Sequence, residues 1–131
     1  MTKRPRIADY MTCDLIQLGP DLEILHAMKT LLEHRISGAP VVDAKERLIG
    51  VLSTKDCLRA ALHGAYHQEW GGRVARYMTK DPVTLDADLD LVAAAERFLA
   101  SEFRRFPVLR DGKLVGQVSR GDLLRALLDQ W

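Results

Sequence analysis

The stretch that decides the fold of this chain is Gly50-Val51-Leu52-Ser53-Thr54-Lys55-Asp56, which returns as Gly116-Gln117-Val118-Ser119-Arg120-Gly121-Asp122. Tyr10-Met11-Thr12 likewise returns as Tyr77-Met78-Thr79. The two copies align at an offset of 67 residues at first, and at 66 after one residue is lost in a turn. An internal repeat sets the architecture and predicts paired, symmetry-related sites rather than one catalytic centre.

The composition is that of an ordinary globular protein with little net charge. The chain has 131 residues, a formal net charge of +1 and a hydrophobic fraction of 47%, which predicts one domain whose halves share a core. This charge balance gives no general reason to expect nucleic acid or a membrane as a partner, and the basic N-terminus lacks the apolar stretch of a secretion signal. Cys13 and Cys57 occupy non-equivalent places in the repeats, so we expect reduced thiols and a cytoplasmic location.

Each repeat predicts the same order of elements, β-α-β-β-α. A short apolar run comes first, an acidic residue then caps a helix, and proline opens a strand because it does not belong inside a central one. A polar turn and a second strand complete a hairpin, and a final helix follows. The expected features are caps at Asp21 and Asp88; core stripes of Leu22, Leu25, Met28, Leu32 and Leu89, Val92, Ala95, Leu99; strands opened by Pro40 and Pro107; and final helices over 56–62 and 122–128.

This order of elements predicts the fold class and the domain organisation. We expect an α/β protein in which two β-α-β-β-α repeats pack sheet to sheet about a pseudo-twofold axis, with helices outside. The expected parts of this one compact module are a lead segment over 1–9, a first repeat over 10–64, a linker over 65–76 and a second repeat over 77–131.

The strongest chemical signal is the motif Gly-x-x-Ser-x-x-Asp, which occurs once per repeat where a strand ends and a helix begins. In the first copy, Gly50 would let a ligand ring approach the backbone, and Ser53 offers a hydroxyl beside the free N–H groups of a helix N-terminus, which suits a phosphate. Asp56 offers two acceptors for the hydroxyls of a ribose. Ser-x-x-Asp is also close to a capping box, so helix capping is the alternative interpretation, and the two uses can coexist.

The recurring segments resemble a tandem pair of CBS (cystathionine-β-synthase) domains over about residues 10–62 and 77–129. The resemblance rests on Tyr-Met-Thr, the helix, Ser37-Gly38-Ala39-Pro40-Val41-Val42 or Arg104-Arg105-Phe106-Pro107-Val108-Leu109, and Gly-x-x-Ser-x-x-Asp. It implies a disc-like module with two clefts that commonly bind adenosine-containing ligands, in a regulatory sensor without chemistry of its own. It also implies a homodimer of modules and an unidentified protein partner.

The resemblance further implies a role for each motif position. It matches Asp56 and Asp122 to the ribose-binding acid, Ser53 and Ser119 to the phosphate-side hydroxyl, and Val51 and Gln117 to the adenine pocket. The other candidate ligand-binding residues are Ser37, Gly38, Ala39, Thr12, Thr79, Val83, Lys55, Arg104, Arg105 and Arg120. For the two threonines, packing at a strand edge is the alternative.

The repeats diverge at the positions that often supply phosphate contacts across the pseudo-twofold axis of this family. The second repeat has Arg104 and Arg105 where the first has Ser37 and Gly38. If the clefts are built from both repeats, the two arginines face the ligand held at Asp56 and clamp a di- or triphosphate. We therefore expect two unequal sites, with the better phosphate site at Asp56. The alternative is a solvated surface pair of arginines.

The leading functional hypothesis is a sensor of AMP, ADP or ATP that needs no cofactor, with Mg²⁺ as an accompanying ion of the nucleotide. The alternatives are a structural dimerisation module with unoccupied clefts, a sensor of S-adenosylmethionine or NAD, and nucleic-acid binding through Lys3, Arg4 and Arg6. We do not expect an enzyme, because there is no acid–base pair, metal set or activated nucleophile. His63 and His67 lack a third ligand for a metal, and Trp70 and Trp131 are expected to cover an edge or a dimer contact.

Overall fold

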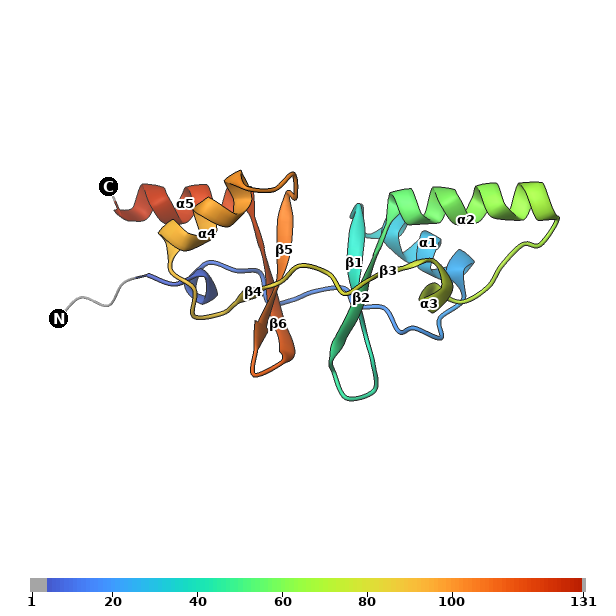
Figure 1. The fold of residues 1–131 in the computed structure, drawn as a ribbon, viewed down its shortest axis with the longest axis horizontal. Helices are drawn as coiled ribbons and strands as arrows, with labels where there is room; N and C mark the ends of the chain where they lie inside the picture. Colours follow the sequence, from blue (N-terminus) through green and yellow to red (C-terminus); the bar gives the residue numbers. More distant parts are fainter. Residues whose placement is uncertain (1–4, 131) are drawn as a thin grey trace. The chain divides into compact units, whose positions relative to one another are not determined.

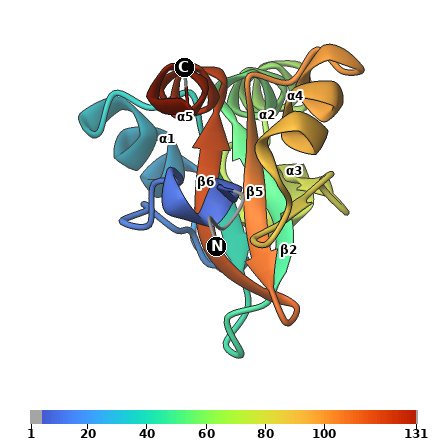
Figure 2. The ribbon, with the colours of Figure 1, turned by 90° about the vertical axis from the view of Figure 1, so that its left-hand side faces the viewer.

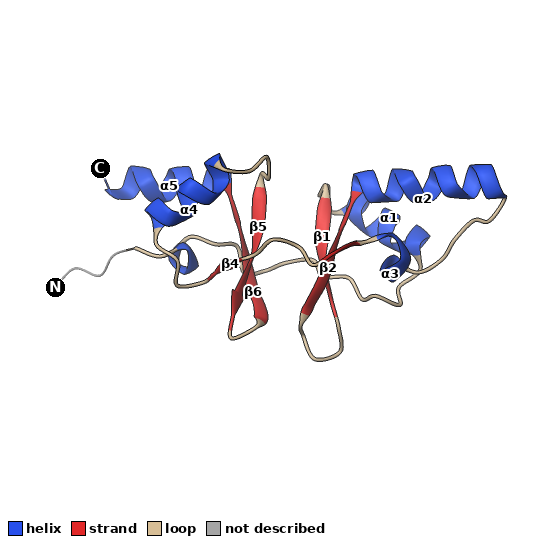
Figure 3. Ribbon diagram, in the orientation of Figure 1, coloured by secondary structure: helices blue, strands red, loops and turns tan. Residues whose placement is uncertain are grey.

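The computed structural model describes residues 5–130, which form two compact units (Figure 1). The central unit is the continuous segment Ile16–Pro82. The terminal unit combines the chain up to Leu15 with the chain from Val83 onward. Each unit has one three-stranded sheet with helices beside it (Figure 3), so the predicted α/β class is confirmed. Lys3, Arg4 and Trp131 lie outside the described residues.

The central unit is a β-hairpin with helices on one side of it. Its elements are α1 (Ile24–Glu33), β1 (Gly38–Val42), β2 (Leu48–Ser53), α2 (Thr54–His67), α3 (Val74–Tyr77) and β3 (Thr79–Lys80). The sheet order is β1-β2-β3, and both pairings are antiparallel. Leu18 adds an isolated parallel bridge to Val41 of β1.

The terminal unit repeats this plan from two separated parts of the chain. Its elements are η1 (Ile7–Asp9), β4 (Leu85–Asp86), α4 (Leu91–Leu99), β5 (Arg105–Arg110), β6 (Lys113–Ser119) and α5 (Arg120–Gln130). The sheet order is β4-β5-β6, with β4 parallel and β6 antiparallel to β5. In Figure 2 this unit faces the viewer, and η1, drawn in blue, lies against the same sheet as α4 and α5. None of the helices within residues 5–130 is long and apolar enough to cross a membrane.

The buried residues form one hydrophobic core in each unit, where the sequence predicts one shared core. The central core is built on Leu18, Ile24, Leu31, Val41 and Leu52. The terminal core is built on Leu85, Leu91, Phe98, Phe106, Val108 and Val118, together with Ile7 from the beginning of the chain.

Each repeat packs against the segment that leads into the other repeat, as the positions of Ile7 and Val74 show. Ile7 is fully buried in the core of the second repeat, and its N–H donates to the carbonyl of Leu89 (3.0 Å). Its counterpart at the 67-residue offset, Val74, is fully buried in the core of the first repeat and donates to the carbonyl of Leu22 (2.9 Å). Each repeat is thus completed by the segment that precedes the other copy.

The exchange continues through the recurring Tyr-Met-Thr segments. Thr79 in β3 pairs with Val51 of β2. Thr12 pairs with Gln117 of β6 through two backbone hydrogen bonds of 2.8 and 2.9 Å. Tyr10-Met11-Thr12 therefore serves the second repeat, and Tyr77-Met78-Thr79 serves the first.

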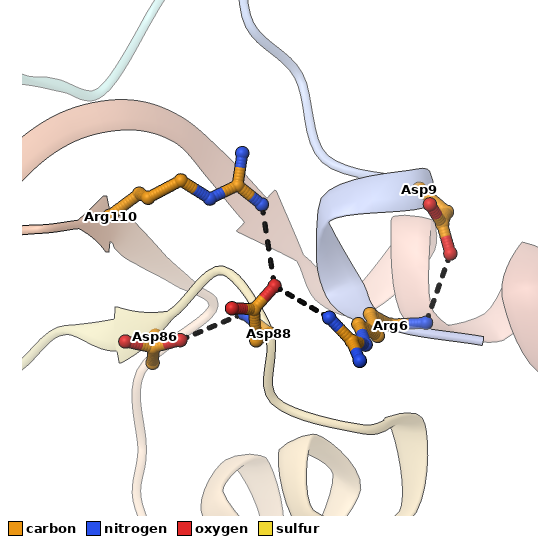
Figure 4. A network of polar contacts seen from close by, with 5 residues as sticks. All are labelled: Arg6, Asp9, Asp86, Asp88 and Arg110. Atoms are coloured by element: carbon orange, nitrogen blue, oxygen red, sulfur yellow. Dashed lines mark hydrogen bonds and ion pairs between the residues drawn. The ribbon is translucent and has the colours of Figure 1, made fainter. Parts of the chain in front are cut away.

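The predicted helix caps at Asp21 and Asp88 are wrong, because both side chains bind arginines of the exchanged segments instead. Arg73 lies 3.4 Å from Asp21, and Arg6 lies 2.9 Å from Asp88. Figure 4 shows that Arg6 and Arg110 both reach the same oxygen of Asp88. Helix α1 follows Glu23, which makes no side-chain cap, whereas α4 is capped by Asp90, whose carboxylate accepts from the N–H of Ala93 (2.8 Å).

The predicted helix stripes are out of phase with the cores. The buried positions are Ile24, Ala27 and Leu31 in α1 and Leu91, Ala94 and Phe98 in α4. Four predicted core residues are instead exposed, namely Leu25, Leu32, Val92 and Leu99. Both series repeat at i, i+3 and i+7, so the spacing alone could not identify the inward face.

The prolines lie within strands rather than at their beginnings. Pro40 is the third residue of β1 and pairs with Val51. Pro107 lies in β5, the central strand of its sheet. This is tolerated because β4 pairs with β5 only from Val108 onward, so the missing N–H of Pro107 is not required by that neighbour.

The final helices differ from prediction, and the predicted linker includes helical residues. Both helices are longer than expected, since α2 continues to His67 and α5 begins at Arg120 and reaches Gln130. The predicted linker over 65–76 therefore contains the end of α2 and the beginning of α3.

Candidate functional site

The first motif forms the corner between β2 and α2, where Ser53 caps the helix. The N–H of Asp56 donates to Ser53 Oγ (3.1 Å), while the N–H and hydroxyl of Ser53 donate to Asp56 Oδ2 (2.9 and 3.0 Å). Arg59, one turn further along α2, donates to the other oxygen, Oδ1 (2.8 Å). The capping-box interpretation is therefore confirmed here.

The second motif forms the same corner between β6 and α5. The N–H of Ser119 donates to Asp122 Oδ2 (2.8 Å), and the N–H of Asp122 donates to Ser119 Oγ (3.1 Å). Arg125 donates to Asp122 Oδ1. The duplication thus preserves the capping box and the arginine three residues after the acid, whereas the bond from the serine hydroxyl to the carboxylate is found in the first copy.

The two motif acids differ from the other polar side chains of residues 5–130 in being buried. Asp56 is 3% exposed and Asp122 is 5% exposed, and they are the buried polar side chains among residues 5–130. A buried carboxylate is costly unless charged or hydrogen-bonding partners surround it. Each corner therefore holds a preorganised, hydrogen-bonded carboxylate at a helix N-terminus.

The motif glycines make room for the chain itself, and the approach of a ligand ring to them stays a prediction. A Cβ on Gly50 would lie 2.7 Å from Met78 Sδ and 2.9 Å from the carbonyl oxygen of Thr79. A Cβ on Gly116 would lie 2.6 Å from Met11 Sδ and 2.9 Å from the carbonyl oxygen of Thr12. The motif glycine of each unit therefore packs against a Tyr-Met-Thr segment, so the two recurring motifs of this sequence contact each other.

The other predicted residues of the central unit lie close to the Ser53 corner. The N–H of Thr54 donates to the carbonyl of Ser37 (2.9 Å), and Gly38 pairs with Ser53 across the hairpin. Val51 lies between its partners Pro40 and Thr79. Ala39 is buried, whereas Lys55 and Thr79 are exposed, so Ala39 contributes to the core rather than to an open surface.

The terminal unit has the same arrangement with different side chains. The N–H of Arg120 donates to the carbonyl of Arg104 (3.1 Å), and Arg105 pairs with Ser119. Both arginines are exposed. Within this unit their backbone therefore lies beside the Asp122 corner, where the first repeat presents Ser37 and Gly38 to the Asp56 corner. Of the remaining residues, Gln117 pairs with Thr12, and Val83 and Arg120 are exposed.

A second polar cluster, which the sequence did not predict as a unit, lies at the end of α2. Arg76 donates to His63 Nε2 (2.9 Å), and Glu69 lies 3.6 Å from the same nitrogen. The rings of His63 and His67 lie 4.5 Å apart, and a Cβ on Gly64 would lie 2.6 Å from the Trp70 ring. Within residues 5–130, no three His, Cys, Asp or Glu side chains are placed to hold a metal ion.

Two further features lie apart from the motif chemistry. Burial, and then the charge of Asp56, raise the pKa of the Cys57 thiol, so this cysteine stays protonated rather than becoming a nucleophile. A hollow of about 310 Å³ in the terminal unit is lined by Arg6, Asp88, Arg110 and neighbouring residues, none of them from the motif.

Two αβ units with duplicated strand-to-helix corners define the class of this protein as a tandem-repeat module. The CBS domain family matches the chain twice, at residues 7–63 and 74–129. The chain belongs to the CBS domain family as a tandem pair.

Known members of the family resemble the chain over nearly its whole length. It is 31% identical over 125 residues to a 17.7 kDa protein of Acidianus ambivalens, covering 95% of this chain and 74% of that protein. It is 31% identical to the chloroplastic CBS domain-containing protein CBSX1 of Arabidopsis thaliana, covering 93% of this chain but only 64% of the relative.

The fold also matches a solved structure of the family. The crystal structure of CBSX2, a CBS-pair protein of Arabidopsis thaliana, in complex with AMP superposes with a TM-score of 0.83 at 33% identity. The match covers 95% of this chain and 97% of that one.

Proposed function

We propose that this chain is a regulatory sensing module that binds adenosine-containing nucleotides at its two motif corners, AMP, ADP or ATP above all, without catalytic chemistry of its own. The observation that carries the proposal is the paired burial of Asp56 and Asp122, each held by hydrogen bonds at the N-terminus of a helix. Two buried carboxylates at equivalent corners are a costly arrangement for capping alone, since exposed caps stabilise helices as well.

Each corner offers complementary groups to one part of a nucleotide. The acid can accept the two ribose hydroxyls, and the serine hydroxyl and nearby helix N–H groups suit a phosphate. Val51 or Gln117, paired with Thr79 or Thr12, offers strand backbone and side chain beside the adenine. Mg²⁺ would accompany a bound di- or triphosphate. CBSX2, which was crystallised with AMP, supports this class of ligand, while S-adenosylmethionine and NAD remain the competing ligands.

A calorimetric titration with AMP, ADP, ATP, S-adenosylmethionine and NAD, repeated on Asp56→Ala and Asp122→Ala, tests the proposal. We expect binding of at least one adenine nucleotide and loss of one site in each variant. A ligand at about 100 times its dissociation constant should also raise the free energy of unfolding by roughly 2.7 kcal/mol. No binding of any of the five ligands would contradict the proposal.

A matched control separates binding from helix capping. Asp90→Ala removes a cap from α4 but touches neither motif. It should lower stability by about 1 kcal/mol and leave the affinities unchanged.

We further propose that the two sites are unequal, because only the terminal unit carries an arginine pair, at Arg104 and Arg105. If the clefts are built from both repeats, the family resemblance assigns these guanidiniums to the phosphates of the ligand at Asp56. Their backbone lies beside the Asp122 corner of their own unit, which makes the Asp122 ligand the other assignment. Either way, two guanidiniums favour di- and triphosphates over a monophosphate.

Single-site proteins distinguish the two assignments. Arg104→Ala with Arg105→Ala is combined with Asp122→Ala, which leaves the Asp56 site, or with Asp56→Ala, which leaves the other. The predicted assignment requires weaker ATP binding, with AMP less affected, in the first combination only. Arg110→Ala, a substitution at the far end of β5, is the control for the loss of positive charge. Equal weakening of AMP, ADP and ATP would reject a polyphosphate clamp.

A dimerisation role is the second candidate, and the exposed apolar side chains of the helices favour it. The helices of the two units expose Leu25, Leu32, Leu58, Leu62, Tyr66, Val92, Leu99, Leu124 and Leu128. Such surfaces mark interaction sites, and we propose a second copy of this chain as the occupant. Sedimentation analysis of Leu58→Glu and Leu124→Glu tests this, with a shift from dimer to monomer as the expected result and a monomeric parent protein as the contradicting one.

The remaining predictions have less support. Arg6, one of the residues predicted to bind nucleic acid, forms an ion pair with Asp88. The cytoplasmic location stays a prediction, as does the unidentified protein partner that would receive the regulatory signal.

A further inference from the structure

In each unit, one arginine donates a hydrogen bond to the motif acid that is proposed to bind ribose. Arg59 donates to Asp56 Oδ1 from one turn along α2, and Arg125 does the same to Asp122 in α5. Both arginines stand three residues after their acids. Their side chains are 62% and 68% exposed, whereas the carboxylates are 4% and 7% exposed.

The hydrogen-bonding capacity of Asp56 shows why this contact matters. Each carboxylate oxygen offers about two acceptor sites. Oδ2 receives two hydrogen bonds from Ser53, and Oδ1 receives one from Arg59. A ribose diol that donates two hydrogen bonds therefore needs one more site than the carboxylate offers within the chain.

Of the partners of Asp56, Arg59 is the one that can leave at small cost. Its side chain is 62% exposed, and its guanidinium is solvated by water when it leaves, while the diol replaces its hydrogen bond to the buried carboxylate. The bonds from Ser53, by contrast, close the first turn of α2 and include a backbone N–H, so breaking them would unwind the helix N-terminus.

We propose that Arg59 is a positioning residue that holds the Asp56 carboxylate and competes with the ribose diol for Oδ1. This inference rests on the proposed nucleotide function and deepens it, because binding then releases a guanidinium on α2. Within residues 5–130, Asp122 receives only one hydrogen bond on each oxygen, so a diol can bind there without displacing Arg125. The released Arg59 side chain follows Leu58, which is exposed on α2. Occupancy of the corner thereby changes the charge presented on the helix surface.

Adenosine is the decisive probe because it carries the diol without a phosphate that Arg59 could attract. We expect Arg59→Ala in an Asp122→Ala background to bind adenosine about two- to five-fold more tightly, as removal of a solvent-exposed competitor allows. Arg125→Ala in an Asp56→Ala background should show no gain, because the described part of the chain leaves two acceptor sites of Asp122 open. With 2′,3′-dideoxyadenosine the gain should vanish. Arg47→Ala and Lys113→Ala remove an exposed charge from the central and terminal units and should change neither affinity.

The outcomes separate this inference from the proposed function. If the parent protein and all variants bind no adenine ligand, the proposed function and this inference both fail. If adenosine binds but Arg59→Ala binds it equally or more weakly, or if dideoxyadenosine gains as much, competition for Oδ1 is wrong while the nucleotide function stands. Arginine side-chain NMR provides a second readout, in which the Arg59 guanidinium signals should shift on addition of adenosine and not of dideoxyadenosine.

Discussion

The central and terminal units build the same corner from differently connected chain. The central unit is one continuous segment, whereas the terminal unit needs the beginning of the chain to complete a repeat that starts at Val83. Duplication therefore copied the contacts but not the connections. A change in the first dozen residues should damage the second motif, and a change just before the second repeat should damage the first.

The units also differ in the side chains around a corner that is otherwise identical. Capping box, buried acid and i+3 arginine recur in both, while Arg104-Arg105 replaces Ser37-Gly38. The recurring part is what the fold of each unit requires and what the proposed recognition of a ribose would use. The divergent part is free to change because its side chains are exposed, or absent in the case of Gly38.

The largest expected effect comes from the exchanged apolar residues. Ile7→Ala should lower the free energy of unfolding by about 2–5 kcal/mol, and Val74→Ala by roughly 1.5–3 kcal/mol, because both side chains are fully buried and their loss leaves cavities. Hydrogen exchange should show the damage crosswise, in α5 for Ile7→Ala and in α2 for Val74→Ala. Faster exchange in α2 for Ile7→Ala would contradict the exchange of leading segments.

The motif glycines should give the next largest effect. Gly50→Ala and Gly116→Ala place a methyl group within 3 Å of a methionine sulfur and a carbonyl oxygen, so each should cost about 1–3 kcal/mol. Adding Met78→Ala should partly rescue Gly50→Ala but not Gly116→Ala, and Met11→Ala should do the reverse. Rescue within the same repeat, such as Met11→Ala with Gly50→Ala, would be inconsistent with the observed pairing.

This exchange could not be predicted from the sequence, although both of its halves could be found there. The two Tyr-Met-Thr segments are identical, and either copy would fit either sheet edge. Local patterns therefore identified the contact surfaces without identifying the partners. The motif corners, by contrast, were predictable because Ser53 and Asp56 interact over three residues of one chain segment.

The helix faces show a second limit of the sequence. Leu25 and Leu32 repeat with the same spacing as Ile24 and Leu31, and only the latter are buried. A helix with two apolar stripes has two faces that are suited to burial. Tertiary packing decides which face joins the core and which is left for a partner. The caps predicted at Asp21 and Asp88 were also wrong because of tertiary contacts, since their arginine partners lie 52 and 82 residues away in the sequence.

Removing the serine cap from each corner allows their contributions to the free energy of unfolding to be compared directly. Ser53→Ala and Ser119→Ala should each lower the free energy of unfolding by about 1 kcal/mol. Ser53→Ala should have the larger effect, because its hydroxyl also donates to Asp56 Oδ2 (3.0 Å). Urea denaturation of both variants checks the order, with Ser53→Thr and Ser119→Thr as controls that keep the hydroxyl. A larger loss for Ser119→Ala would show that the corners are not energetically equivalent in this way.

The smallest effect should come from the arginines that fasten the exchanged segments. Arg6 binds Asp88 at 2.9 Å and shares it with Arg110, while Arg73 approaches Asp21 at 3.4 Å. All of these side chains are largely exposed, so each substitution to alanine should cost about 0.2–1 kcal/mol, with the larger value for Arg6. The difference from the parent protein should shrink in 1 M salt, because screening weakens exposed pairs. A salt-independent loss for Arg6→Ala would instead mean that its aliphatic stem, packed over the chain, fastens the terminal unit.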